Sequence, residues 1–100
     1  MTGRILVVDD EQNIRRMLRA VLEEQEYEVG DVGGGSEACV ACENFDPDVV
    51  LLDLVMPPGP DGIETLALLK ERCPELVVIM MSGKASLHDA VNEKYPRSSL

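Results

Sequence analysis

The chain alternates short, uninterrupted apolar runs with longer segments whose apolar residues recur every three or four positions. Two of these runs, Ile5 to Val8 and Val49 to Leu52, are each followed at once by an aspartate. A short run that is apolar at every position predicts a strand buried on both faces. Tyr27 to Val32 and Leu76 to Met81 complete a set of predicted strands that are spread along the chain.

The segments between these strands predict helices. In the first segment five apolar residues fall at helical spacing and form one stripe: Ile14, Met17, Leu18, Val21 and Leu22. The charged residues of this helix lie outside the stripe: Arg15, Arg16, Arg19, Glu23 and Glu24. Such a pattern is typical of an amphipathic helix that packs one face on a sheet.

Turn residues set the limits of the remaining helices. Three glycines precede Ser36, which we expect to cap a second helix that runs towards Phe45 and ends at Asp46 and Pro47. We expect a third helix, which Pro74 ends, to carry four residues inward: Ile63, Leu66, Leu69 and Cys73. A last helix is expected from about Ser86 to Pro96.

Strands that alternate with helices predict a doubly wound α/β fold, with a parallel sheet covered on both sides. The length of 100 residues and the hydrophobic content of 45% suffice for one such domain. In these folds ligands bind at the carboxyl ends of the strands. Four polar residues stand at that edge of the predicted sheet: Asp9, Asp10, Asp53 and Ser82.

These residues predict a cation site. Three carboxylates that converge on one small cleft repel one another unless a proton or a cation neutralises them. Magnesium prefers oxygen ligands and keeps several waters, so it suits such a cleft. Transition metals usually recruit histidine or cysteine, and the single histidine, His88, is expected at the surface of the last helix.

Each of these residues also has an ordinary structural interpretation. Asp10 could cap the first helix, Asp9 could be a solvated residue at a strand end, and Ser82 could belong to a turn. Asp53 is harder to explain in this way, because it follows a buried strand and opens a loop rich in proline and glycine. Together, at the ends of three strands, the four favour a site.

The chain resembles the receiver domains of two-component response regulators. The resemblance covers nearly the whole sequence and depends on four motifs in order: I-L-V-V-D-D-E at residues 5–11, L-L-D-L-V-M-P at 51–57, D-G at 61–62 and M-S-G at 81–83. It implies a flavodoxin-like sheet with the strand order 2-1-3-4. It also implies a receiver domain over residues 1–96, with 97–100 as a tail.

The resemblance assigns a role to each candidate residue. Asp53 matches the phosphoacceptor, Asp9 and Asp10 match the acidic pair that binds Mg²⁺, and Val55 matches the residue whose backbone carbonyl completes the metal site. Ser82 matches the hydroxyl that turns towards the phosphoryl group. The implied donor is a phosphohistidine on a sensor histidine kinase, and the implied result is a switched protein-binding face rather than an enzymatic turnover.

The sequence departs from the family at its end. A fifth strand with a phosphate-contacting lysine and a fifth helix would follow residue 100, and Lys84 stands too close after Ser82 to match that lysine. The fourth strand would then be an exposed edge. We therefore expect a homodimer through this strand and the last helix, or a marginally stable fragment.

Two alternative functions remain open from the sequence. One is a phosphohydrolase of the haloacid-dehalogenase type, which would need a second aspartate where this chain has Val55. The other is a receiver-like interaction or dimerisation module that is not phosphorylated. Whether Asp53 can be phosphorylated distinguishes the second alternative from the receiver function.

Charge and cysteine content narrow the partners and the location. The formal net charge of −10 argues against direct binding to nucleic acid or to an anionic membrane. No apolar run approaches the roughly 20 residues of a membrane span. The three cysteines suggest a reducing cytoplasm, and Cys39 and Cys42 form a C-x-x-C that is interpreted as helix packing rather than as a redox motif.

Overall fold

The computed structural model describes residues 3–54 and 62–81. Strands and helices alternate along these residues, and their bounds are β1 Arg4–Val8, α1 Gln12–Glu24, β2 Glu28–Val32, α2 Gly35–Phe45, β3 Val49–Asp53, α3 Gly62–Arg72 and β4 Val77–Met81. The four strands and three helices predicted within these ranges are therefore confirmed, with bounds that differ from the predicted ones by a few residues.

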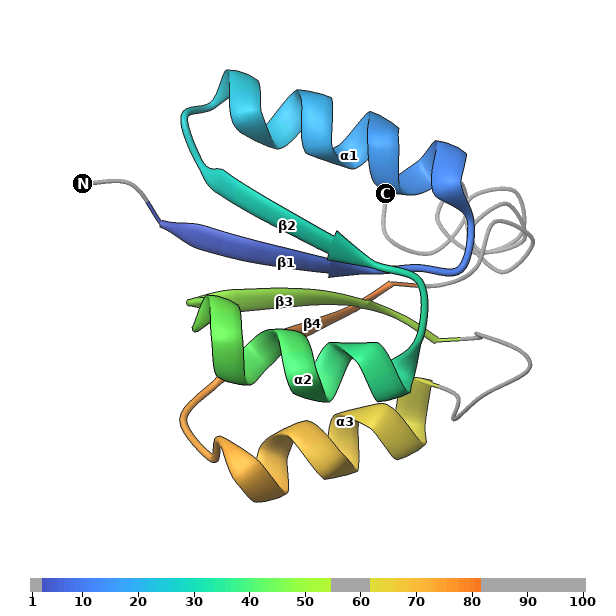
Figure 1. The fold of residues 1–100 in the computed structure, drawn as a ribbon, viewed down its shortest axis with the longest axis vertical. Helices are drawn as coiled ribbons and strands as arrows, with labels where there is room; N and C mark the ends of the chain where they lie inside the picture. The colour runs from blue at the N-terminus through green and yellow to red at the C-terminus, as the bar shows by residue number, and fades with distance from the viewer. Residues whose placement is uncertain (1–2, 55–61, 82–100) are drawn as a thin grey trace, which may run out of the picture.

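The strands form one parallel sheet in the order β2-β1-β3-β4. Helix α1 covers one face of the sheet, and α2 and α3 cover the other (Figure 1). This arrangement is the doubly wound α/β fold with the predicted strand order. The order reverses between β1 and β3, because the chain passes from β1 to its neighbour β2 and then returns to the other side of β1.

The pleat of the strands divides the core into two clusters. Alternate residues of β1, Leu6 and Val8, pack with α2 and α3, while Ile5 and Val7 pack with α1. Strand β3 repeats this division, since its residues at 50 and 52 belong to the first cluster and those at 49 and 51 to the second. Burial on both faces is the reason these strands are apolar at every position.

Helix α1 covers less of the sheet than its apolar stripe predicts. Leu18 and Leu22 pack on β1 and β2, but Met17 is 54% exposed and Val21 is 56% exposed. The stripe is wider than the contact that α1 makes with the described part of the sheet. Arg15 lies outside the stripe as predicted, but its side chain is only 17% exposed because it bonds Asp31 and the carbonyl of Asp9.

The start of α2 also differs from the prediction. Gly34, rather than Ser36, is the N-cap, and Ser36 already lies within the helix. Glu37, in the first turn, extends towards the glycines, since its Oε1 would be 3.4 Å from a Cβ placed at Gly34. A carboxylate at this position stabilises the helix N-terminus without a serine cap. The helix ends as predicted, at Asp46 in the left-handed conformation.

Helix α3 is rotated relative to the predicted inward face. Leu69 is buried, and Leu66 and Cys73 pack against the core as predicted, but Ile63 is 59% exposed. The reason is Gly62, whose close approach to the end of β3 fixes the rotation of the first turn. Position 62 therefore faces inward with Thr65 and Leu69, and position 63 faces solvent.

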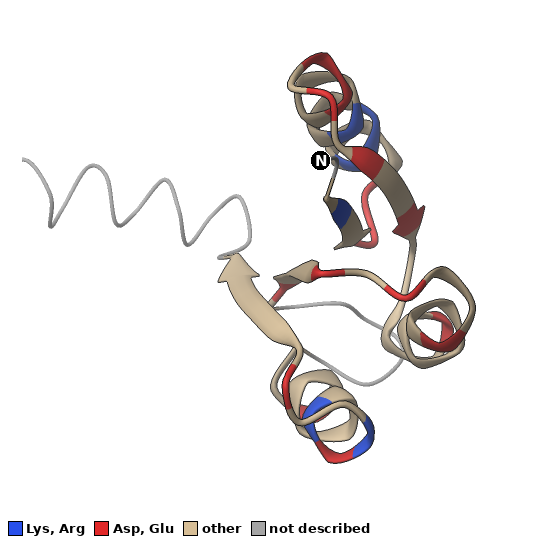
Figure 2. Cartoon of the chain, turned by 90° about the vertical axis from the view of Figure 1, so that its left-hand side faces the viewer, with Lys and Arg blue, Asp and Glu red and all other residues tan. Residues whose placement is uncertain are grey.

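Strand β4 is the edge of the described sheet. Its residues at 78 and 80 pack into the core that α2 and α3 cover, but Val77 is 53% exposed and Ile79 is 50% exposed. In register, Val77 and Ile79 lie beside Val49 and Leu51, on the face that α1 covers only over β1 and β2. This exposure agrees with the expectation of an exposed fourth strand. Figure 2 shows β4 as a strand without charged residues at the end of the sheet.

Several predictions lie outside the described residues. These are the positions of Val55 and Ser82, the last helix with His88, and the tail at 97–100. Of the helices within the described ranges, none has the length and apolar character needed to cross a membrane.

Candidate functional site

The register of the sheet places two of the predicted site residues side by side. Val8 of β1 is paired with Leu52 of β3, so Asp9 and Asp53, one residue further on, leave neighbouring strands at the same edge. The preceding residues, Val8 and Leu52, face α2 and α3, so alternation along a strand places both aspartate side chains on the side of α1. Adjacent parallel strands thus bring together carboxylates that are 44 positions apart in the sequence.

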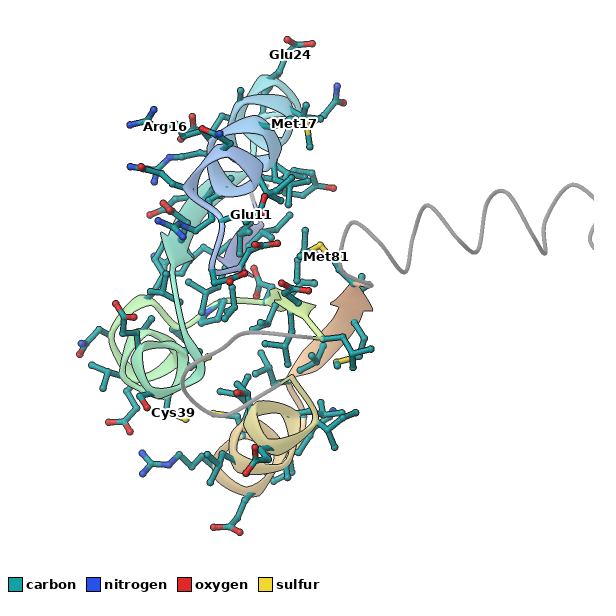
Figure 3. All side chains as sticks on the ribbon, turned by 90° about the vertical axis from the view of Figure 1, so that its right-hand side faces the viewer. Glu11, Arg16, Met17, Glu24, Cys39 and Met81 are labelled. Carbon is teal, nitrogen blue, oxygen red and sulfur yellow. The ribbon has the colours of Figure 1, made fainter. Side chains whose placement is uncertain are left out.

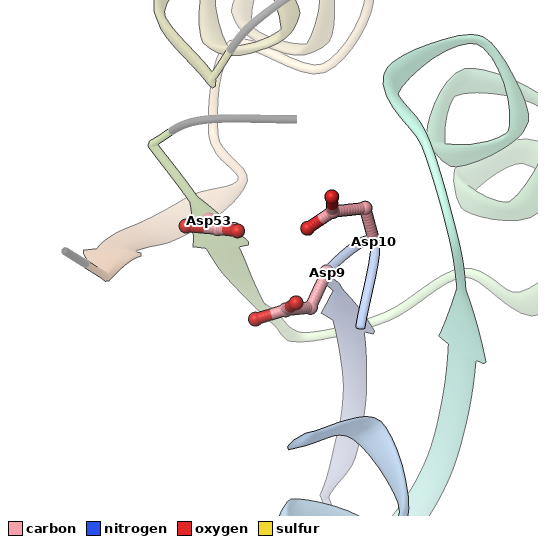
Figure 4. A group of neighbouring side chains, drawn as sticks. All are labelled: Asp9, Asp10 and Asp53. Atoms are coloured by element: carbon pink, nitrogen blue, oxygen red, sulfur yellow. The ribbon is translucent and has the colours of Figure 1, made fainter. Parts of the chain in front are cut away.

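Asp10 completes a cluster of three carboxylates. Asp9, Asp10 and Asp53 each offer one oxygen within 4.8 Å of the others. Figure 4 shows the three side chains turned towards one another from the ends of β1 and β3. Asp53 is 4% exposed and Asp9 is 7% exposed, while Asp10 is exposed. The site is therefore closed on the side of the sheet and open on the side of Asp10.

The turn after β1 fixes the orientation of the acidic pair. The backbone N–H of Asp9 donates to the carbonyl of Val32 at 3.2 Å, and the N–H of Glu11 donates to Oδ1 of Asp9 at 2.8 Å. The N-cap of α1 is Glu11, which makes no side-chain cap bond. The alternative in which Asp10 caps the helix is therefore wrong, and its carboxylate faces the site instead.

Burial makes the negative charge of Asp9 unfavourable. Desolvation raises the pKa of this carboxyl group above its usual value, and the neighbouring charges of Asp10 and Glu11 raise it further. The hydrogen bond from the Glu11 amide and the charge of Arg15 act in the opposite direction but do not cancel the increase. A carboxylate held in this way gains stability when a cation binds beside it.

Gly62 packs closely against the backbone of Asp53 and Leu54. A Cβ at this position would lie 2.4 Å from the backbone carbonyl oxygen of Asp53 and 2.6 Å from the Cα of Leu54. The N–H of Gly62 donates to the carbonyl of Leu54 at 2.8 Å. The first turn of α3 therefore packs directly against the backbone that carries Asp53. The sequence motif contained this glycine, but the contact could not be inferred from the motif alone.

The three carboxylates fit a hard divalent cation. Oxygen ligands in this number, with one side open for water, are what Mg²⁺ prefers in proteins. The cluster contains neither histidine nor cysteine, which transition-metal sites usually recruit. Asp9, Asp10 and Asp53 could therefore hold a metal ion, as predicted from the sequence.

The C-x-x-C pair is part of the core and not of this site. Cys42 is buried beside Leu52 and Leu69 in one cluster, and Cys39 packs against that cluster. Burial, with smaller effects of Cys73 and Cys39, raises the pKa of the Cys42 thiol to about 11. A redox-active thiol needs a lowered pKa, so the packing interpretation of this motif is favoured.

Most of the chain is similar in sequence to one known protein family. The profile of the response regulator receiver domain matches residues 5–94. The transcriptional regulatory protein ResD of Bacillus subtilis is 42% identical over 81 residues, which are 81% of this chain and 33% of ResD. The DNA-binding response regulator MtrA of Mycolicibacterium smegmatis is 36% identical over 91 residues, 39% of its length. The chain thus spans about a third to two fifths of these relatives.

Solved structures give the same result. The response regulator protein TrrA of Thermotoga maritima, crystallised in complex with Mg²⁺-BeF, superposes with a TM-score of 0.78 at 33% identity. The aligned region covers 92% of this chain and 77% of the TrrA chain. NtrX of Brucella abortus superposes with a TM-score of 0.80 at 33% identity, covering 92% of this chain and 21% of NtrX. Sequence and fold therefore point to the same family.

Proposed function

Because the chain belongs to the response regulator receiver family, we propose that Asp53 accepts a phosphoryl group from a sensor histidine kinase in a reaction that requires Mg²⁺. The observation that carries this proposal is the cluster of three carboxylates, two of them buried, at the carboxyl ends of β1 and β3. We assign Asp9, Asp10 and Asp53 to the metal site, with the backbone carbonyl of Val55 as a further ligand. Ser82 is assigned to the contact with the phosphoryl group.

Asp53 is suited to act as the nucleophile. Its carboxylate oxygen would form the bond to phosphorus while the bond between phosphorus and the imidazole nitrogen of the donor breaks. The bonding electron pair stays with the imidazole, which then takes a proton from solvent. When bound, Mg²⁺ neutralises charge on the transferred oxygens. The protein itself supplies a fixed position for the carboxylate, because β3 and Gly62 hold the backbone of Asp53.

Phosphorylation would change the charge at this edge of the sheet and switch a protein-binding face. The acyl phosphate adds negative charge and strong hydrogen-bond acceptors, towards which Ser82 would move. This chain is assigned no direct role in binding nucleic acid, because its net charge is −10. We place the domain at residues 1–96, in the cytoplasm, where its free cysteines would stay reduced.

The test is intact-mass spectrometry after incubation with Mg²⁺ and acetyl phosphate. We expect an added mass of one phosphoryl group on the wild type, and none for Asp53→Asn or when Mg²⁺ is removed with a chelator. Asp46→Asn is the matched control, because Asp46 is an exposed aspartate at the other end of the sheet and asparagine tolerates its left-handed backbone. An adduct on Asp53→Asn as strong as on the wild type would contradict the proposal.

A second function, dimerisation through β4, is favoured by the exposure of this strand. Val77 and Ile79 are half exposed on β4, which has no charged residue and is the edge strand among the described residues. Such an edge favours pairing with another chain. We propose a homodimer through this strand and the helix that the sequence predicts from about Ser86, with or without phosphorylation. Sedimentation velocity tests this: Ile79→Lys should shift a dimer to monomer, whereas a wild type that is monomeric at high concentration would contradict the proposal.

A further inference from the structure

Arg15 of α1 connects the acidic edge of the sheet to β2. Its Nη1 donates a hydrogen bond to the backbone carbonyl oxygen of Asp9 at 2.7 Å, and its Nε donates to Oδ2 of Asp31 at 2.8 Å. The side chains of Arg15 and Asp31 are only 17% and 25% exposed. A single guanidinium group therefore ties the residue that follows β1 to the carboxyl end of β2.

A second arginine holds Asp31 in place. Nη1 of Arg19, one turn further along α1, donates to Oδ1 of Asp31 at 2.7 Å. Each oxygen of Asp31 thus accepts from a different guanidinium group. Arg19 is itself fixed by Glu23, which accepts from its Nε at 3.2 Å. Charge-assisted hydrogen bonds of this kind restrict the rotamers of all the groups involved, so Asp31 can orient the planar head of Arg15.

The contact between Arg15 and the acidic site goes through the backbone. Arg15 bonds the carbonyl oxygen of Asp9, whereas Oδ1 of Asp9 accepts from the Glu11 amide. An arginine paired with the carboxylate itself would compete with a cation for the same oxygens. Bonding to the carbonyl fixes the position of the turn and leaves the carboxylates directed towards Asp53.

We propose that Arg15 is a positioning residue for the cation site, oriented by Asp31 and Arg19. It holds the turn after β1 so that the carboxylates of Asp9 and Asp10 face Asp53. This role rests on the proposed function, in which the three aspartates bind Mg²⁺. It would make the ion network between α1 and β2 part of the phosphorylation site, although none of its members touches the metal.

Positioning and simple electrostatics predict opposite results for the loss of Arg15. A positive charge near the carboxylates repels a cation, so its removal alone would tighten Mg²⁺ binding. If Arg15 instead holds the turn in place, its removal weakens binding, as the loss of groups that orient metal ligands usually does, by about 10-fold or more. The sign of the change therefore distinguishes the two roles.

The experiment is a calorimetric titration of the full chain with MgCl₂. We expect Arg15→Gln to raise the Kd for Mg²⁺ by about 10-fold, and Arg15→Lys, which keeps the charge but lacks the planar fork of donors, to raise it by less. Arg16→Gln is the control, because Arg16 is exposed, points away from the sheet in Figure 3 and carries the same charge on the same helix. An unchanged or lower Kd for folded Arg15→Gln would overturn the proposal.

A second variant keeps the test decisive if Arg15→Gln does not fold. Asp31→Ala should also raise the Kd, because Arg15 loses the group that orients it. The double variant Arg15→Gln/Asp31→Ala should bind no more weakly than Arg15→Gln, since the two residues act through one contact. Glu24→Gln controls for the loss of a negative charge, because Glu24 is exposed on the same helix. A wild-type Kd for Asp31→Ala, or additive effects in the double variant, would overturn the proposed role.

The wild type separates this inference from the proposed function. If the wild type neither binds Mg²⁺ nor gains a phosphoryl group, the proposed function fails, and the role of Arg15 fails with it. If the wild type does both and Arg15→Gln keeps its Kd, only the role of Arg15 is wrong. Hydrogen exchange at the Glu11 amide gives an independent measure, which should become faster in Arg15→Gln without Mg²⁺ and stay unchanged in Arg16→Gln.

Discussion

Charged groups are arranged differently at the two ends of the parallel strands, which we call the amino edge, where the strands begin, and the carboxyl edge, where they end. At the amino edge, charged groups are paired within the chain: the side chain of Arg4 donates to Glu28 and to the carbonyl of Phe45, and its backbone N–H donates to Asp48. At the carboxyl edge, three carboxylates gather within 4.8 Å, and the nearby Arg15 bonds a backbone carbonyl instead of one of them. Electrostatic repulsion is therefore concentrated at the edge where a cation would bind.

The amino edge also contains buried groups that are not part of the acidic site. A cavity of about 430 Å³ opens at the amino edge, where Cys42, Cys73 and two prolines contribute to its lining. Its buried thiol has a raised pKa and is poorly reactive. The cysteines near the amino edge thus belong to the packed core, whereas the proposed function places the reacting carboxylates at the carboxyl edge. The following predictions test this division.

The largest effect is expected at the backbone contact behind Asp53. Gly62→Ala would place a Cβ 2.4 Å from a carbonyl oxygen, and we expect it to lower the free energy of unfolding by about 3 kcal/mol. The control is Gly30→Ala, because a Cβ there would meet only side-chain atoms at 3.5 Å or more. Urea denaturation measures both. Equal losses of unfolding free energy in the two variants would show that the close contact at Gly62 matters no more for stability than the looser packing at Gly30.

Magnesium should stabilise the carboxyl edge specifically. At a concentration of about 100 times the Kd, a ligand bound only by the folded state adds about 2.7 kcal/mol to the free energy of unfolding. We expect this gain in the wild type and in Asp46→Asn, and its loss in Asp10→Asn. Thermal unfolding with MgCl₂, against NaCl of equal ionic strength, gives the comparison. A gain that survives in Asp10→Asn would place the cation elsewhere.

A smaller effect is expected from pH in the absence of magnesium. The pKa of Asp9 is raised in the folded state by burial, so between the unfolded and the folded pKa the native state binds more protons than the unfolded state. The contribution of Asp9 to stability therefore increases as the pH falls through its folded pKa, and is lost as the pH rises. Urea denaturation from pH 7 to 4 should show this contribution as a difference between wild type and Asp9→Asn. Identical pH profiles would contradict it.

The smallest effect concerns the amino edge and leaves stability unchanged. With its pKa raised to about 11, Cys42 should react with iodoacetamide at pH 8 more slowly than Cys39 or Cys73, because the thiolate is the reacting form. Peptide mapping measures the three rates, and in urea they should become similar. Preferential native-state labelling of Cys42 would indicate an activated thiol and a chemical role for this edge.

Strand positions and the acidic site could be predicted because they depend on local patterns. Apolar runs that end in aspartate follow directly from a sheet buried on both faces with a polar edge. Helix rotation could not be predicted in the same way. The outward position of Ile63 depends on the contact of Gly62 with the end of β3, and the inward turn of Arg15 depends on Asp31 of another strand. Such tertiary contacts leave no periodic signal in one sequence.

The central claim is that Asp53 carries the phosphoryl group, and the most direct test is to locate the group after reaction with Mg²⁺ and acetyl phosphate. Peptide mapping of the wild type under mild acid conditions should place the added mass on the peptide that contains Asp53. The adduct should be removed by hydroxylamine, as expected for an acyl phosphate. An adduct on another residue would contradict the account. So would an adduct that resists hydroxylamine, because such resistance is expected of a phosphate ester of a hydroxyl group.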